Sequence, residues 1–530
     1  MKKIDISNPT FEKLITCNNI YVDKTRYLYN LLTDGGTYYF CSRPRRFGKT
    51  LTVNTLEQIF KGRKELFKGL YIDSTDYDWK EYPVIHIDFG AITYINIDNL
   101  RNQIKNLILG IAKNYDVTIP LNFEYNEALR FLIEELSKKE KVVILIDEYD
   151  KIISDNIYHE DIKSIRDIIS GFYSVFKSEN DNIRFCFITG VTKYSKVSIF
   201  SSMNNLRDIS FEDEYAYLLG YTDEELIKYF NDYIEEGIEK SGLQRNEYLN
   251  KLKFKYDGYR FTSESKTLYN PVSIGSFFAS GGKQFNNYWI ETGNTKLLAD
   301  IAKKVKYNID NSLDEPMSRD DISYFDIVDI ASSSVSLMQY KSLLFQSGYL
   351  TIKKAEDDGN TLFLDYPNNE VKSAFASTML NVYANIDTRL NLNSVRLRNA
   401  FEDRNIEKAM MIIKSYFANV SYLLTDKSKE SDYHLMFHSM LVAIDGDVNV
   451  ELLTNKGRID AVLKTKNTIY VIEFKRDKSA KEAIDQIKDK GYMEKYLAWK
   501  TDNPNHEIYL LGINFNSKER NIDDWKLEIA

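Results

Sequence analysis

Short apolar runs alternate with longer stretches of helical apolar spacing through the first two hundred residues. The runs predict strands at 38–41, 84–89, 142–146 and 185–190. The helical spacing predicts helices over 51–61 and 128–136. The run at 142–146 has no polar interruption, which is typical of a strand buried on both faces of a sheet. Together these segments predict an α/β domain with a parallel sheet and helices on both faces.

The pattern changes after residue 215, so the first domain is assigned to 1–215. A helical stripe that begins near Glu225 predicts a helical lid over 216–300. The stretch 301–390 is weakly patterned and is predicted only as a connecting domain. Residues 391–530 predict a second α/β domain, with helices at 391–423, 428–442 and 481–489 and strands at 448–453, 460–463, 469–474 and 508–511.

The composition is that of a soluble globular protein long enough for two to four domains, with 530 residues, 43% of them apolar and 28% charged. Its net charge of −8 argues against a general coating of DNA but leaves room for a local basic patch. Three scattered cysteines without CxxC spacing predict reduced thiols and a cytoplasmic location. No apolar run resembles a signal core or reaches membrane-spanning length, so no membrane partner is expected.

A cationic loop follows the predicted strand 38–41 and opens the helix after it. A loop at such a junction offers backbone N–H groups and the positive end of the helix dipole to phosphates. Lys49 would reach the β- and γ-phosphates of ATP, and Thr50 would place its hydroxyl on Mg²⁺. The expected nucleotide-binding residues are Arg43, Pro44, Arg45, Arg46, Phe47, Gly48, Lys49 and Thr50. Arg43 stands where such loops usually begin with glycine.

Two acidic residues close the buried strand at 142–146. Asp147 would hold Mg²⁺ through water, and Glu148 would polarise the attacking water as the catalytic base. The alternative is a helix start after a basic turn, with Asp147 as its cap. The order of the two motifs and their places on strands and helices favour the nucleotide site. Arg45, Arg46 and Arg207 are the candidates for an arginine finger.

A second acidic constellation lies near the C-terminus. Asp460 and Glu473 fall on adjacent predicted strands and would bind Mg²⁺ through oxygen ligands. Lys475 shares a strand face with Glu473 by the period of two, where it would orient water or offset developing charge. The backbone carbonyl of Phe474 is a further candidate ligand. Positive charge gathers here in an otherwise acidic chain, at Lys475, Arg476, Lys478, Lys481, Lys488 and Lys490, which suits contact with phosphates.

Several segments together resemble the bacterial "predicted AAA-ATPase" family. They are Tyr21–Thr25, Arg43–Thr50, Glu65–Ile72, Thr189–Lys193, Asn204–Leu206 and Tyr256–Phe261. The resemblance spans nearly the whole chain. It implies that arginine is tolerated at position 43, and that the usual C-terminal partner is a restriction-endonuclease-like domain of the PD-(D/E)XK nuclease superfamily.

The superfamily resemblance implies two more site residues. Gln486 matches a recurrent catalytic glutamine, and Glu430 matches a glutamate on the first helix that often joins the metal site. A bare pattern of two acids and a lysine also arises by chance, as the charged end of an amphipathic strand. The strand–strand–helix context and Gln486 favour a nuclease site. A domain that keeps the fold without the activity is a third alternative.

The combined expectation is a Mg²⁺-dependent nuclease regulated by ATP binding and hydrolysis. Its expected partner is nucleic acid, with DNA ahead of RNA, in defence or in the biology of mobile elements. The alternative is a signalling ATPase whose C-terminal domain binds nucleic acid or a protein without cutting. The trigger, the sequence preference and the formation of a homo-oligomer stay open at this point.

Overall fold

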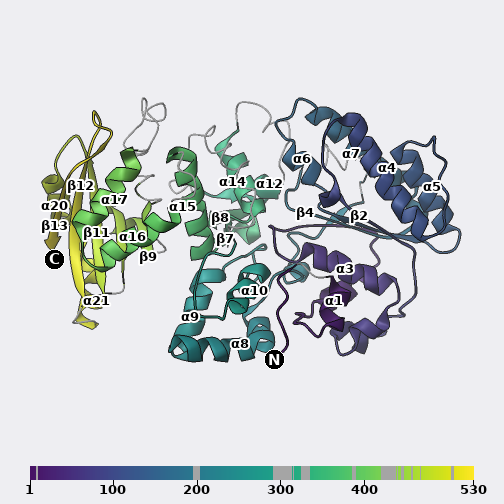
Figure 1. Ribbon diagram of the computed structural model, residues 1–530, viewed down its shortest axis with the longest axis horizontal. Coiled ribbons are helices and arrows are strands. Elements are labelled where there is room, and N and C mark those ends of the chain that lie inside the picture. Colours follow the sequence, from purple (N-terminus) through teal and green to yellow (C-terminus); the bar gives the residue numbers. More distant parts are fainter. Residues whose placement is uncertain are drawn as a thin grey trace. The chain divides into compact units, whose positions relative to one another are not determined.

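A computed structural model gives the structure of the protein. It describes residues 1–530 except 8–9, 195–202, 204, 290–312, 314, 324–334, 385–389, 419–436, 438–439, 443–446, 455–456, 466 and 503–505. The described residues fall into two compact units. The first unit is made of residues in 1–293 and 309–368, and the second of residues in 369–530 (Figure 1).

The first unit is built on a parallel five-stranded sheet in the order β2-β3-β4-β1-β5. Its strands are β1 (Tyr38–Ser42), β2 (Val84–Asp88), β3 (Val142–Asp147), β4 (Ile183–Gly190) and β5 (Arg207–Asp208). The predicted strands are confirmed, and β3 is buried along its whole length. Strand β4 lies between β1 and β3. One strand therefore separates the cationic loop Arg43–Thr50, the phosphate loop, from the acidic end of β3.

Helices cover both faces of this sheet, as predicted (Figure 1). One face carries α1 (Phe11–Thr16) and α3 (Lys49–Phe60), and the other carries α4 (Ile97–Asn114), α5 (Tyr125–Ser137), α6 (Lys151–Asp155) and α7 (Ile162–Ser178). The helix α2 (Thr25–Thr33) precedes β1. Short 3₁₀ turns are η1 (Lys64–Phe67), η2 (Tyr71–Ser74), η3 (Phe89–Ala91), η4 (Asn180–Asn182) and η5 (Asp213–Tyr215).

The region after the sheet is helical, as predicted for the lid. It contains α8 (Asp223–Ser241), α9 (Arg245–Tyr256) and α10 (Pro271–Ala279). Thr222 caps α8 in a reciprocal capping box with Glu225, which satisfies free N–H groups of the first turn. The three helices share an apolar cluster that also includes Val22 from the N-terminal segment.

Residues 315–368 hold a small antiparallel sheet where the sequence predicted only a connecting domain. The strands β6 (Met317–Ser318), β7 (Thr351–Glu356) and β8 (Thr361–Asp365) pair in the order β6-β8-β7. The turn η8 (Asp357–Gly359) joins β7 to β8, and the helices are α12 (Arg319–Ser323) and α14 (Leu337–Ser347). Every residue from Tyr340 to Gln346 is buried, including Lys341, Ser342 and Gln346, so the polar positions there do not mark a solvent face of α14.

The second unit contains a five-stranded mixed sheet in the order β13-β12-β11-β10-β9. The strands are β9 (Asp447–Thr454), β10 (Gly457–Lys464), β11 (Thr468–Arg476), β12 (Glu507–Asn516) and β13 (Asn521–Ile529). Its helices are α15 (Asn369–Ala384), α16 (Leu390–Glu402), α17 (Ile406–Ala418), α20 (Ala480–Asp489) and α21 (Leu497–Asp502), with the turn η9 (Glu494–Tyr496). The predicted strand 508–511 lies within β12, and β13 follows it as a mostly polar edge strand that was not predicted.

Two apolar cores sandwich this sheet. Helices α16 and α17 cover one face, and α20 covers the other. A Cβ at Gly512 of β12 would lie 2.2 Å from the carbonyl oxygen of Ala480, so glycine permits the close approach of α20. In the described part of the chain, no helix is long and apolar enough to cross a membrane.

Candidate functional site

The phosphate loop joins β1 to α3 and holds its own lysine. Arg46 and Gly48 have positive φ angles of 67° and 96°, which turn the chain sharply before the helix. The buried Lys49 Nζ donates to the carbonyl oxygens of Arg43 and Pro44, both at 2.9 Å. Burial lowers the pKa of Lys49, and the nearby carboxylate of Asp147 opposes that shift. The Lys49 ammonium is therefore bonded to carbonyl oxygens of the same loop that would bind the phosphates.

The carboxyl ends of β2, β3 and β4 gather polar groups beside this loop. Asp88 and Asp147 are partners in the register of β2 and β3. The Thr189 hydroxyl at the end of β4 donates to Asp147 Oδ1 at 2.6 Å. Glu148 has a φ of 51°, and its pKa is raised by burial and then by the charge of Asp147. Strand β4 thus supplies a hydroxyl that orients Asp147.

The two residues that follow Glu148, Tyr149 and Asp150, hold the turn that carries it in place through hydrogen bonds. Asp150 accepts hydrogen bonds from the N–H groups of Val191 at 3.1 Å and Thr192 at 2.7 Å. The Tyr149 hydroxyl donates to the carbonyl of Thr192 at 2.7 Å. Sequence reasoning assigned no role to Thr189 or Asp150. The available signal was the resemblance at Thr189–Lys193, a segment that runs from the end of β4 directly against this turn.

A cavity of about 430 Å³ opens over the loop, within the size range of ligand sites. Arg45, Arg46, Phe47, Gly48, Lys49 and Thr50 line it, together with Glu148. Apolar lining residues come from the N-terminal segment and from the stretch before α8, including Ile4, Ile20, Leu218 and Leu219. The lining therefore combines cationic and polar residues with apolar ones.

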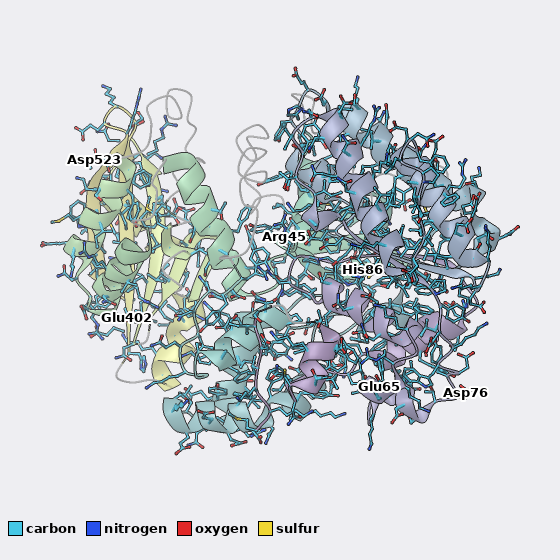
Figure 2. The ribbon with its side chains drawn as sticks, turned by 45° about the vertical axis from the view of Figure 1, so that its right-hand side comes forward. Arg45, Glu65, Asp76, His86, Glu402 and Asp523 are labelled. Carbon is cyan, nitrogen blue, oxygen red and sulfur yellow. The ribbon has the colours of Figure 1, made fainter. Side chains whose placement is uncertain are left out.

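Three residues predicted for the nucleotide site lie behind this cavity. Within the described chain, Arg43, Pro44 and Asp147 are not among its lining residues. Arg43 Nη1 donates to the carbonyls of Ser42 at 2.9 Å and Ser210 at 2.7 Å, and its guanidinium stacks 4.3 Å from the ring centre of Phe261. Burial lowers the pKa of Arg43. The Arg43 side chain is buried, whereas Arg45, which is labelled in Figure 2, is a lining residue of the cavity.

Arg207, a candidate arginine finger, is held at the edge strand β5. Its guanidinium pairs with Asp34 at 2.7 Å and with Glu212 at 2.5 Å. The hydrogen bonds that Arg207 donates to the Glu212 carboxylate are the main cause that raises the pKa of Arg207. These contacts hold its guanidinium at β5, and Arg207 is not a lining residue of the cavity that the structure describes. Arg45 and Arg46 are the two arginine-finger candidates that do line it.

Strand pairing and one helix bring the four central residues of the second site together. The antiparallel register that pairs Ala461 with Ile472 puts Asp460 opposite Glu473. Asp460 Oδ2 accepts a hydrogen bond from the N–H of Phe474 at 2.8 Å. Lys475 Nζ donates to Glu473 Oε1 at 3.2 Å and to Gln486 Oε1 at 2.6 Å. Gln486, on α20, also donates its amide to Glu473 Oε1.

Glu473 is the electrostatic centre of this cluster. Its exposed fraction is 2%, and burial followed by the charge of Asp460 raises its pKa to about 7. Its Oε2 atom is buried without a hydrogen-bond partner among the described residues. An unpaired carboxylate oxygen beside a second carboxylate suits a hard divalent cation such as Mg²⁺. Asp460 and Glu473 thus fit a cation that keeps several water ligands.

The other predicted residues of this site divide into two groups. Glu430 lies outside the described residues, as does most of the predicted helix 428–442. Among residues that are described, no group of three or more His, Cys, Asp or Glu side chains is arranged so that it could hold a metal ion. Of the predicted basic residues, Lys488 pairs with Glu528, while Lys478, Lys481 and Lys490 are exposed on the loop and helix after β11.

Comparison with known proteins matches both halves of the chain. The family model "Predicted AAA-ATPase" matches residues 4–200, and the model "PD-(D/E)XK nuclease superfamily" matches residues 428–525. The "Uncharacterized protein in vnfD 5'region" of Azotobacter chroococcum mcd 1 is 32% identical across 99% of both chains. Both matched families support an enzyme. The chain therefore belongs to the predicted AAA-ATPase family and carries a PD-(D/E)XK nuclease superfamily domain toward its C-terminus.

Proposed function

We propose that the protein binds and hydrolyses ATP at the cavity over the phosphate loop and thereby regulates a Mg²⁺-dependent nuclease that acts on DNA. One observation carries this proposal most directly. Asp460, Glu473, Lys475 and Gln486 meet on one face of a sheet, with a buried carboxylate oxygen left unpaired. We assign the ATPase core to 1–215, the lid to 216–300, the connecting domain to 301–390 and the nuclease domain to 391–530.

In the nucleotide site, each residue has a separate task. Lys49 binds the β- and γ-phosphates by exchanging its bonds to the loop carbonyls for bonds to phosphate oxygens. Thr50 and Asp147 would hold Mg²⁺, which supplies charge neutralisation for the phosphates when it is bound. Glu148 orients and polarises the attacking water. Thr189 keeps Asp147 in one orientation through its hydrogen bond.

In the nuclease site, Asp460 and Glu473 would hold Mg²⁺, with the Phe474 carbonyl as a further ligand. The cation, when bound, polarises the scissile phosphate and lowers the pKa of a water. Lys475 orients that water and offsets developing negative charge. Gln486 keeps the lysine in place, since its side-chain oxygen accepts a bond from Lys475 while its amide donates to Glu473. The exposed lysines after β11 would contact the DNA backbone.

The setting of this activity is part of the proposal. The three cysteines are free thiols, two of them buried, which supports a reducing cytoplasm. Defence against foreign DNA or control of mobile elements is an analogy from a nuclease under nucleotide control. A homo-oligomer completes the proposal, and the mass of the protein in solution tests it.

The decisive experiment is a cleavage assay with the full-length protein on plasmid DNA and on RNA. Each substrate is incubated with and without ATP, and with Mg²⁺ or EDTA. We expect Mg²⁺-dependent cleavage of DNA that changes with ATP and disappears in Asp460→Asn. Substrate binding without cleavage under all conditions would instead favour a signalling ATPase with a non-cutting C-terminal domain.

A further inference from the structure

The segment Tyr256–Phe261 begins at the last residue of α9 and has no part in the proposed nucleotide chemistry. Its sequence is Tyr-Asp-Gly-Tyr-Arg-Phe. Tyr259 pairs with Leu268 through two backbone hydrogen bonds, which hold the segment in place. The side chains of Tyr259 and Phe261 are buried although the segment lies between helices. What it contacts on each side indicates its role.

On one side the segment contacts two side chains of the phosphate loop, those of Phe47 and Arg43. The ring of Phe47 meets Tyr259 edge-on at 4.8 Å and Phe261 at 5.3 Å, measured between ring centres. The guanidinium of Arg43 stacks on Phe261. Such aromatic contacts in a close-packed interior transmit displacement because no free volume absorbs it.

On the other side the segment touches the end of the first unit. A Cβ added to Gly258, whose φ is 122°, would lie 1.8 Å from the carbonyl oxygen of Pro367. Only glycine permits this approach of two backbones. Pro367 stands two residues before Asn369, where the second unit begins. The side chains of Tyr259 and Phe261 thus contact the phosphate loop, and the backbone at Gly258 approaches the chain that leads to the nuclease domain.

A second set of contacts ties the segment to β7 and α14. The N–H of Arg260 donates to Thr351 Oγ1 at 2.6 Å, and that hydroxyl donates back to the carbonyl of Arg260 at 2.9 Å. A Cβ at Gly348, just after α14, would lie 2.6 Å from Cβ of Pro44 in the phosphate loop. The stretch from Gly348 to Thr351, between α14 and β7, therefore contacts the phosphate loop at Pro44 and the segment Tyr256–Phe261 at Arg260.

Movement along these contacts would start at Lys49 in the nucleotide site. Lys49 Nζ is bonded to the carbonyls of Arg43 and Pro44. A phosphate that takes this ammonium competes with both carbonyls, and those two residues are the ones that contact Phe261 and Gly348. Loss of the two bonds changes the backbone of the loop at the point where the link begins.

We propose that Tyr256–Phe261 is the link through which nucleotide occupancy reaches Pro367 and the start of the nuclease unit. The inference rests on the proposed function, because it needs a nucleotide at the phosphate loop. The coupling runs through packed contacts that have two arrangements, with Lys49 bonded to its own loop or to phosphate.

The test is amide hydrogen exchange of the full-length protein, followed in peptides that span 362–376. The probes are a non-hydrolysable ATP analogue and ADP. We expect the analogue to change exchange in these peptides by at least about twofold in the wild type. Binding of the analogue is measured in parallel by calorimetry, so occupancy is known for every sample.

Two variants interrupt the link at different points. Gly258→Ala forces the backbone away from Pro367, and Phe261→Leu removes the ring beneath Phe47 and Arg43. Both should bind the analogue with a Kd within about threefold of the wild type and lose the exchange response. The matched control is Gly242→Ala, also at a positive φ of 70° but with nothing within 4 Å of its added Cβ, and it should keep the response.

The possible outcomes distinguish a failure of this inference from a failure of the proposed function on which it rests. A wild type that binds no nucleotide overturns the proposed function and the link together. A wild type that binds the analogue without any change at 362–376 overturns the link alone, as does a full response in both variants. If Gly258→Ala does not fold, Phe261→Leu and the wild-type response decide the question.

Discussion

The two sites of this protein differ in how far each is assembled before any ligand arrives. In the nuclease domain, the strand register of β10 and β11 sets Asp460 opposite Glu473, and Gln486 holds Lys475 beside them. A buried carboxylate oxygen is left without a partner in the described structure. In the nucleotide site, the lysine that would bind phosphate is already bonded to two loop carbonyls.

The difference follows from the secondary structure that carries each site. Strands fix side-chain direction by their period of two and by backbone pairing, so a site on paired strands needs little rearrangement. A loop between a strand and a helix can exchange its internal hydrogen bonds for bonds to a ligand. This contrast is what we expect if, as proposed, a preassembled nuclease site is controlled through the nucleotide-binding loop.

The largest expected effect is the loss of cleavage in Asp460→Ala and Glu473→Ala. Losing a ligand to a catalytic metal costs several kcal/mol of transition-state stabilisation, so cleavage should fall by about a thousandfold or more. ATP turnover should stay at the wild-type rate, because the two sites lie in different units. The measurement is plasmid cleavage beside phosphate release, with Glu482→Ala on the exposed face of α20 as the control. Full cleavage in both site variants would remove the nuclease assignment.

Lys49→Ala should reduce ATP turnover by about a hundredfold or more, because the phosphates lose their fixed cation. It should also change the rate of cleavage, although Lys49 lies in the other unit. Cleavage is compared in four conditions, with no nucleotide, ADP, ATP and a non-hydrolysable analogue. The exposed Lys68→Ala is the control for a lost surface charge. Equal cleavage by wild type and Lys49→Ala in all four conditions would mean that the domains are joined without regulation.

Glu148→Gln should retain ATP binding and lose about a hundredfold in hydrolysis, since its shape is kept but the water is no longer polarised. Affinity is measured by calorimetry and turnover by phosphate release. A variant with wild-type turnover would place the catalytic base elsewhere. A variant that also loses affinity would assign Glu148 to binding.

Thr189→Val should have a smaller effect on the same reaction. The substitution keeps the shape of the side chain and removes the hydrogen bond to Asp147 Oδ1. Loss of a group that orients a metal ligand typically costs 10- to 100-fold, and we expect about tenfold in ATP turnover. The dependence of turnover on Mg²⁺ concentration should shift to higher concentration. Thr189→Ser is the matched control, because it keeps the hydroxyl.

The smallest effect on chemistry is expected for Arg43→Leu, although Arg43 belongs to the phosphate-loop motif. Its side chain lies in the interior against Ser210 and Phe261, behind the cavity. The loss of its hydrogen bonds should lower the free energy of unfolding by about 1–3 kcal/mol. The Kd for ATP should stay within about threefold of the wild type. Denaturant unfolding and calorimetry measure the two quantities, and a large loss of affinity would return Arg43 to the binding site.

Local patterns in the sequence determined the parts of this protein that depend on neighbouring residues. Buried strands such as β3 are continuous apolar runs, and the loop 43–50 and the acids after β3 are contiguous motifs. Helix α14 and strand β13 escaped prediction for opposite reasons. The helix is buried from Tyr340 to Gln346, polar residues included, so its polar positions do not mark a solvent face. The strand is an edge with mostly polar residues.

Only the tertiary structure decided which side chains of a motif line the cavity and which lie in the core. Arg43 and Arg45 are two positions apart in one loop, yet one stacks on Phe261 and the other lines the cavity. The same holds for Gln486, which reaches Glu473 because α20 packs closely over Gly512. These directions depend on packing partners that are remote in the chain, because an interior at crystal-like density admits few side-chain arrangements. No local pattern carries that information.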